Sequence, residues 1–172
     1  MSAIDVSRDQ RESGAQTAEP PPSHQRLVRR VLSYAFVRPS GSAARRAAIT
    51  VGLIIGSALL AASGAIHLEL WSMGYRTIPT IGPLFLIQGI SGALVAALLV
   101  ASRRLFLVVM AAGFMLATIG GLLLSIYFGL FGFMDTLAAP YAGLSLWIES
   151  SGAVLLAVIG VALVHGRSDA DR

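Results

Sequence analysis

The chain contains no cysteine and no lysine, and only 13% of its 172 residues are charged. Without cysteine there are no disulfides, iron–sulfur clusters or thiolate zinc sites. The charged fraction is roughly half that of an ordinary soluble domain, whereas 55% of the residues are hydrophobic and the mean hydropathy is +0.74. Folding at this size buries only about 70% of the surface, too little to hide so many apolar groups. The composition excludes a water-soluble enzyme and predicts a membrane protein.

Four nearly uncharged runs are long enough to cross the roughly 30 Å hydrocarbon core, which takes about 20 helical residues. They cover residues 47–71, 80–101, 105–128 and 142–164. Strands of a transmembrane barrel would alternate polar and apolar residues, and these runs do not. Because the connections are short, the sequence predicts an all-α membrane protein whose domain, residues 47–166, is a four-transmembrane-helix bundle in up-down-up-down order.

The positions of the arginines predict the orientation of this bundle. Twelve of the thirteen lie before the first run, between the second and third, or after the fourth, and only Arg76 lies on the other side. An excess of positive charge marks the cytoplasmic side. We therefore expect a bacterial inner-membrane protein with a cytoplasmic N-terminus and a cytoplasmic tail, residues 167–172. The leader before the first run is too long, and the run too continuous, for a cleaved signal peptide.

The segment before the first run divides into two parts. Residues 1–23 form a polar leader that ends in prolines and is predicted to be disordered. Residues 24–46 repeat apolar residues at helical spacing and contain arginines but no acid, which predicts a cytoplasmic amphipathic helix on the anionic leaflet. The arginines are Arg26, Arg29, Arg30, Arg38, Arg45 and Arg46. The alternative is a solvated tail whose charges only set topology. The expected partner is the lipid bilayer and not nucleic acid, since the basic stretch is short and tethered.

Small residues recur along each run, and such residues let membrane helices approach closely. The stripes are Gly52, Gly56, Ser63 and His67; Ser91, Gly92 and Ala96; Gly113, Ala117, Gly121 and Ser125; and Gly152, Ala153 and Gly160. Gln88 and Glu149 each lie nine residues beyond a proline, Pro79 and Pro140. Duplication of a two-helix unit and coincidence both explain this spacing.

Glu149 is the leading candidate for a functional residue. At 1.5 Å per residue it lies about 13 Å inside the outer edge, where an ionised side chain costs at least roughly 3 kcal/mol and normally faces the bundle interior. Gln88 has a similar depth, and His67 lies about one turn below the outer end of its helix. We predict a polar pocket of Glu149, Gln88 and His67, open to the outside. Its predicted rim is Glu69, Tyr75, Arg76 and Asp135, with Glu69 and Arg76 forming an exposed ion pair.

Three interpretations of Glu149 stay open: a hydrogen bond to Gln88 or a serine that joins helices, proton or solute handling, or a site for a lipophilic cofactor or lipid. Haem with two histidine ligands is excluded, because no two of His24, His67 and His165 can meet across one haem. Copper on methionine and histidine lacks any motif spacing. No phosphate-binding loop, nucleophile elbow or zinc protease motif is present. We expect no catalytic residue, no metal and no cofactor.

Residues 67–71 (HLELW) and 74–88 (GYRTIPTIGPLFLIQ) resemble uncharacterised small integral membrane proteins of high-GC bacteria. The use of arginine without lysine agrees with such a source, and the resemblance implies no activity. In size and layout the chain is also similar to DoxX-type four-helix membrane proteins, some of which are linked to quinone-dependent redox chemistry.

From these observations we expect a non-catalytic accessory subunit or binding module, packed in a larger membrane complex or a homo-oligomer. One alternative is a small proton-coupled transporter that uses Glu149. A further alternative is a quinone-linked membrane redox protein.

Overall fold

The computed structural model describes residues 23–170, without the side chains of residues 23, 26, 30 and 167–170. The predictions for the polar leader, for the side chains of Arg26 and Arg30, and for the tail at 167–172 fall outside what is described. Two compact units divide the chain, residues 1–32 and 33–172. In the described part of the first unit, the beginning of helix α2, the large apolar side chains Leu27, Val28, Val31 and Leu32 are exposed.

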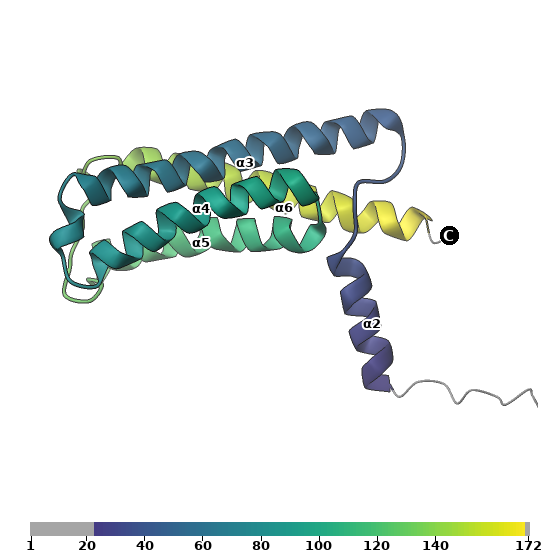
Figure 1. Cartoon of the computed structure of the whole chain (residues 1–172), viewed down its shortest axis with the longest axis horizontal. Coiled ribbons are helices and arrows are strands. Elements are labelled where there is room, and N and C mark those ends of the chain that lie inside the picture. The colour runs from purple at the N-terminus through teal and green to yellow at the C-terminus, as the bar shows by residue number, and fades with distance from the viewer. Residues whose placement is uncertain (1–22, 171–172) are drawn as a thin grey trace, which may run out of the picture. The chain divides into compact units, whose positions relative to one another are not determined.

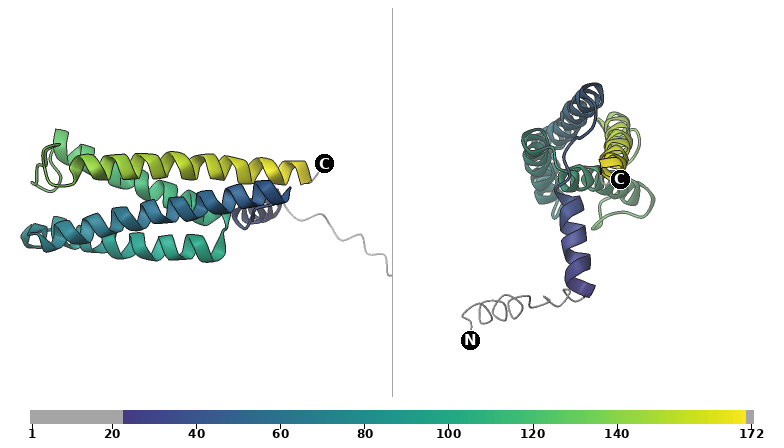
Figure 2. Two further views of the ribbon diagram at one scale, coloured as in Figure 1. Left: turned by 90° about the horizontal axis from the view of Figure 1, so that it is seen from above. Right: turned by 90° about the vertical axis from the view of Figure 1, so that its right-hand side faces the viewer.

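The described residues are helical and contain no strand. The elements are α2 (Ser23–Ala35), α3 (Ala43–Ser72), the short 3-10 helix η1 (Tyr75–Thr77), α4 (Ile81–Ser102), α5 (Leu105–Tyr127) and α6 (Ala142–Ala170). Helices α3 to α6 lie alongside one another (Figures 1 and 2), and each is long and apolar enough to cross a membrane. Helix α4, for example, is about 33 Å long at 1.5 Å per residue. The prediction of an all-helical chain with four membrane-length apolar helices is confirmed.

Helices α4 and α6 begin in the same way. Each follows a proline and one residue with positive φ, Thr80 (φ 66°) before α4 and Tyr141 (φ 62°) before α6. The carbonyl oxygens of these two residues accept the first helical hydrogen bonds, from the backbone N–H groups of Leu84 (3.1 Å) and Ser145 (2.7 Å). Positive φ is uncommon outside glycine. The chain therefore turns sharply before entering each helix.

The two ends of the α3–α6 bundle are defined by the connections that meet there. At the far end the α3–α4 connection (73–80) meets the α5–α6 connection (128–141), since the rings of Tyr75 and Phe133 lie 5.7 Å apart. At the near end the Leu105 N–H donates to the carbonyl of Val37 at 3.1 Å. The guanidinium of Arg45 donates there to the carbonyl of Ala162 on α6.

The near half of the bundle is densely packed. Its apolar side chains with at most 1% exposure are Leu53, Leu60, Leu99, Val108, Ala111, Met115, Leu156 and Leu163. Two glycines of α3 admit side chains of α6, because a Cβ at Gly52 would lie 2.9 Å from Ile159 Cδ1 and one at Gly56 would lie 2.8 Å from Leu156 Cδ2. This is the close approach predicted for small residues on α3.

Candidate functional site

The carboxyl group of Glu149 lies inside the bundle, with 1% of the residue exposed. Its Oε1 accepts two hydrogen bonds, from Ser63 Oγ on α3 at 2.8 Å and from Ser145 Oγ at 2.9 Å. Ser145 precedes Glu149 by one helical turn and therefore shares its face of α6. The hydrogen bond from Gln88 to Glu149, considered from the sequence, is not formed. The carboxyl instead joins α3 to α6 through two hydroxyl groups.

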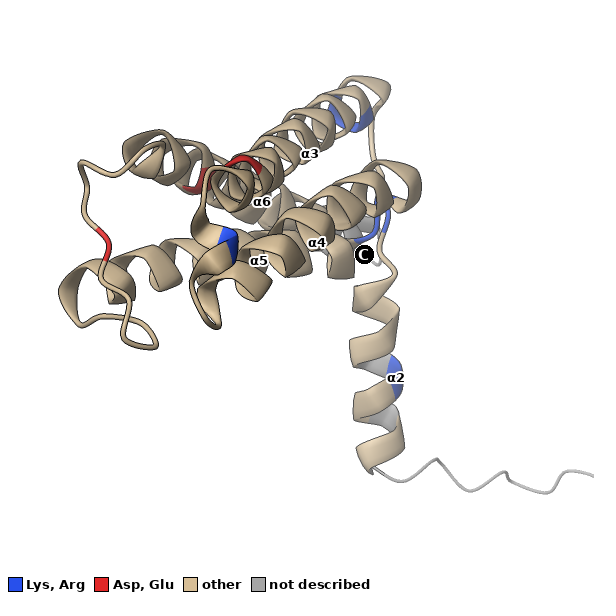
Figure 3. Cartoon of the chain, turned by 60° about the vertical axis from the view of Figure 1, so that its left-hand side comes forward, with Lys and Arg blue, Asp and Glu red and all other residues tan. Residues whose placement is uncertain are grey.

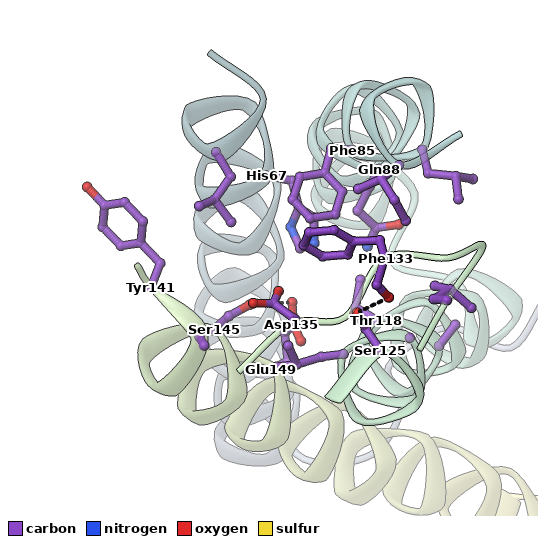
Figure 4. A pocket seen from close by; sticks show the side chains of 18 of the residues that line it. His67, Phe85, Gln88, Thr118, Ser125, Phe133, Asp135, Tyr141, Ser145 and Glu149 are labelled. Atoms are coloured by element: carbon purple, nitrogen blue, oxygen red, sulfur yellow. Dashed lines mark hydrogen bonds between the residues drawn. The ribbon is translucent and has the colours of Figure 1, made fainter. Parts of the chain in front are cut away.

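Glu149 forms part of the wall of a cavity of about 240 Å³ in the far half of the bundle. Gln88 and His67 line the same cavity, and so does Asp135 of the α5–α6 connection. Figure 4 shows these side chains around the cavity. Most of the remaining wall is apolar, with Leu84, Ile87, Leu122, Leu130, Phe85 and Phe133 among its members. The cavity is therefore an apolar space with a few polar groups at fixed positions.

The side-chain nitrogen of Gln88 is a polar group of this wall that has no hydrogen-bond partner. This atom, Nε2, is buried. A buried donor that is left unsatisfied costs about 1–3 kcal/mol, so such a group usually has a ligand or water to bond. Because Gln88 lines the cavity, an acceptor atom bound there would satisfy it.

His67 is held in place from two sides. Its Nδ1 is 2.9 Å from the carbonyl oxygen of Ser63, and its ring lies edge-on to Phe85, with 5.2 Å between centroids. Phe85 in turn stacks on Tyr75 at 5.0 Å, and Tyr75 packs edge-on to Phe133. These four rings form an aromatic cluster at the far end of the cavity.

Burial raises the pKa of Tyr75 above its ordinary value of 10.0, and the negative charge of Asp135 raises it further. Both effects disfavour the phenolate. Tyr75 therefore stays neutral at physiological pH. Asp135, which is half-buried, uses its Oδ1 to accept the N–H of Thr136 at 2.8 Å.

The cavity lies between α4 and α5, the consecutive helices of the bundle that contact each other least. A Cβ at Gly121 or at Gly113 of α5 would meet no atom within 4 Å. The prediction that the small-residue stripe of α5 makes close helix contacts is therefore wrong at these two positions. Gly121 instead lines the cavity, together with Ala117 and Ser125.

The α5–α6 connection forms part of the wall at the far end of the cavity. Leu130 and Phe133 exchange backbone hydrogen bonds of 2.7 and 2.9 Å across a tight turn in which Gly132 has φ 80°. A positive φ is readily adopted by glycine. The turn directs Leu130 and Phe133 to the cavity wall, a role that the irregular sequence of this connection did not indicate.

The residues predicted for the pocket and its rim occupy different places. Glu149, Gln88, His67 and Asp135 line the cavity, and Tyr75 reaches it only through its stack on Phe85. Glu69 and Arg76 are exposed and are not among the lining residues. No ion pair joins them in the described part of the chain, and the guanidinium of Arg76 lies 6.0 Å from the centroid of the Trp71 ring instead.

Among the side chains that the structure describes, no three from His, Asp or Glu gather closely enough to hold a metal ion. The comparisons with known proteins match no family, no curated protein and no solved structure. The inferences below therefore rest on the site itself.

Proposed function

We propose that the protein is a membrane-embedded binding module for a lipophilic molecule whose polar end carries a hydrogen-bond acceptor. The observation that carries this proposal is the buried, unpartnered Nε2 of Gln88, a residue in the wall of a mostly apolar cavity. Ligand sites typically combine apolar walls with a small number of fixed polar groups. Gln88 supplies a donor in this cavity, and the carboxyl of Glu149, anchored by two serines, supplies oxygen atoms.

The apolar packing of the near half of the bundle favours a binding function over a transport function. On the near side of Glu149, the next core side chains are Leu156, Leu60 and Met115, each with 0% exposure. A proton or solute path would need polar groups or water there. The transporter alternative therefore has less support than the binding module.

A pair of matched ligands tests the proposal. Menadione carries two carbonyl acceptors on an apolar bicyclic ring, and 2-methylnaphthalene has nearly the same shape without them. Isothermal titration of the detergent-solubilised protein, corrected for partition into empty micelles, is expected to give at least about tenfold tighter binding of menadione, a typical effect of one buried hydrogen bond.

A variant then assigns the effect to the cavity. Gln88→Leu keeps the side-chain size and removes the donor, so it is expected to abolish the preference for menadione. The control Gln25→Leu makes the same substitution at an exposed position of α2 and is expected to leave the preference unchanged. Equal affinity for both ligands in the wild-type protein, or an unchanged preference in Gln88→Leu, would overturn the proposal.

We also propose that the four helices span the bacterial inner membrane in up-down-up-down order with both termini in the cytoplasm, and that α2 lies on the cytoplasmic surface. The arginine distribution supports this orientation, and the exposed apolar residues of α2 support its contact with lipid.

Since the chain lacks cysteine, single cysteine substitutions show on which side of the membrane a residue lies. In intact cells, an impermeant maleimide is expected to label Ala138→Cys at the far end and not Ala44→Cys at the near end, both at exposed positions. The reverse pattern would contradict the orientation.

A further inference from the structure

A second hollow lies at the opposite end of the bundle from the cavity that contains Gln88. It is a cleft of about 630 Å³ between the start of α3, the end of α4 and the segment that precedes α3. Among the described residues, its charged lining residues are Arg38, Arg46 and Arg103, and no acidic residue lines it. Thr50 and Ser102 add hydroxyl groups to its wall. The cleft therefore gathers positive charge and hydrogen-bond donors from three segments of the chain.

The guanidinium groups retain donors for a ligand. Among the described residues, none pairs with the guanidinium of Arg38. Arg103 uses only its Nε, which donates to the carbonyl of Val100 at 3.3 Å, and Arg46 uses only Nη1, which donates to the carbonyl of Gly41. All three side chains are exposed. The remaining N–H groups can donate to the oxygens of a phosphate, for which the planar guanidinium is well shaped.

The acidic residues do not neutralise this cleft. The described acidic side chains, Glu69, Asp135 and Glu149, belong to the far half of the bundle, and Figure 3 shows the separation between them and the arginines that begin α3. Among the described residues, no carboxylate lines the cleft to compete for its arginines, so an anion there meets a positive field.

The apolar part of the cleft indicates which phosphate it would hold. Ala47, Val51 and Ala101 complete its wall, and they belong to the ends of two helices long enough to cross a membrane. The cleft would lie at the level of the lipid headgroups, with helix surface directly below it for acyl chains. A free phosphate ion would make no use of these apolar residues.

We propose that this cleft binds the phosphate group of an anionic phospholipid, with Arg38, Arg46 and Arg103 as the headgroup ligands. This inference is independent of the proposed function of the far cavity. The sequence predicts only a general attraction of the basic segment, residues 24–46, to the anionic leaflet, whereas this proposal names one binding site. The site also includes Arg103, which lies outside that segment.

Binding of defined lipids to the full chain tests the site. Native mass spectrometry of the detergent-solubilised protein is expected to show retention of phosphatidylglycerol and not of phosphatidylcholine. Combined substitution Arg38→Gln, Arg46→Gln and Arg103→Gln is expected to weaken phosphatidylglycerol binding by at least about tenfold, since each arginine near a lipid surface contributes several-fold. Circular dichroism and gel filtration identify any loss of fold.

A matched control separates a site from general charge. Arg29→Gln, Arg76→Gln and Arg104→Gln together remove three charges at residues that are not among those lining the cleft, and this variant is expected to retain phosphatidylglycerol as the wild type does. Equal loss in both triple variants, or equal retention of phosphatidylcholine by the wild type, would overturn the proposal. Displacement of the lipid by millimolar inorganic phosphate would overturn the assignment to a lipid, because it would show that the apolar wall adds nothing.

Discussion

The near and far halves of the bundle contain the same four helices but are built differently. In the near half, leucine, valine and methionine side chains fill the space between the helices, and Leu60, Leu99 and Leu156 have no exposure at all. In the far half, glycine, serine, glutamine and glutamate lie among the apolar residues that face the interior, and a cavity of about 240 Å³ remains. The difference shows how one apolar bundle can be densely packed at one end and hollow at the other. Four experiments test this comparison, in descending order of expected effect.

Truncation of a core leucine in the near half is expected to have the largest effect. Leu156→Ala is expected to lower the free energy of unfolding by about 2–5 kcal/mol, because it opens a void in a packed core. The matched change Leu116→Ala, at a side chain that is 60% exposed, creates no void, so we expect a much smaller loss. Denaturation with sodium dodecyl sulfate in mixed micelles measures both. Similar losses would remove the basis for calling the near half packed.

Two glycine substitutions compare a tight helix contact with the open cavity wall. A Cβ at Gly64 would lie 2.9 Å from the carbonyl oxygen of Gly89, so Gly64→Ala must push α3 and α4 apart at an expected cost of about 1–3 kcal/mol. At Gly121 the same methyl group meets nothing within 4 Å. Gly121→Ala is expected to be neutral or to stabilise by about 0.5–1 kcal/mol through helix propensity. The same denaturation assay decides, and a destabilised Gly121→Ala would show that α5 packs more closely than described.

The serine–glutamate contact tests how strongly the polar groups hold the far half together. Ser63→Ala removes one hydrogen bond to Glu149, and such interhelical bonds contribute about 0.6 kcal/mol on average in membranes. In a Glu149→Leu background the carboxyl is already absent, so Ser63→Ala removes no hydrogen bond to it. A double-mutant cycle is therefore expected to give a small positive coupling energy. Zero coupling would mean that the contact positions the carboxyl without stabilising the bundle.

The smallest expected effect is a shift in the titration of Tyr75. Since the charge of Asp135 raises the pKa of the phenol, Asp135→Asn is expected to lower this pKa toward its ordinary value. The folded protein binds the phenolic proton more tightly than the unfolded chain does, so Tyr75 lowers stability as pH rises from about 10 through the folded pKa. Ultraviolet difference titration against a Tyr75→Phe variant measures the shift. An unchanged pKa in Asp135→Asn would show that burial alone accounts for it.

The four helices were predictable, because an uncharged segment long enough to cross a membrane satisfies its backbone hydrogen bonds by forming a helix. The interior position of Glu149 was also predictable from the cost of exposing a charge to lipid, and its partner Ser145 could have been found from the four-residue spacing. Ser63 as the second donor could not, since the rotation of α3 relative to α6 depends on packing that no single helix encodes. For the same reason, the sequence could not predict that Gly64 packs against the backbone of α4 whereas Gly121 makes no close contact.

The similar turns before α4 and α6 place two different polar residues at matching positions of the two helices. Gln88 and Glu149 each lie seven residues after the first residue of their helix, and each helix starts from a proline and a left-handed residue. The two positions are thus equivalent by construction, yet one holds a hydrogen-bond donor and the other a carboxyl. Two identical residues at positions 88 and 149 would offer the same polar group to either end of a bound ligand. In the binding module that we propose, the unlike pair would distinguish the two orientations of a dipolar head, so the pocket would favour one orientation of its ligand.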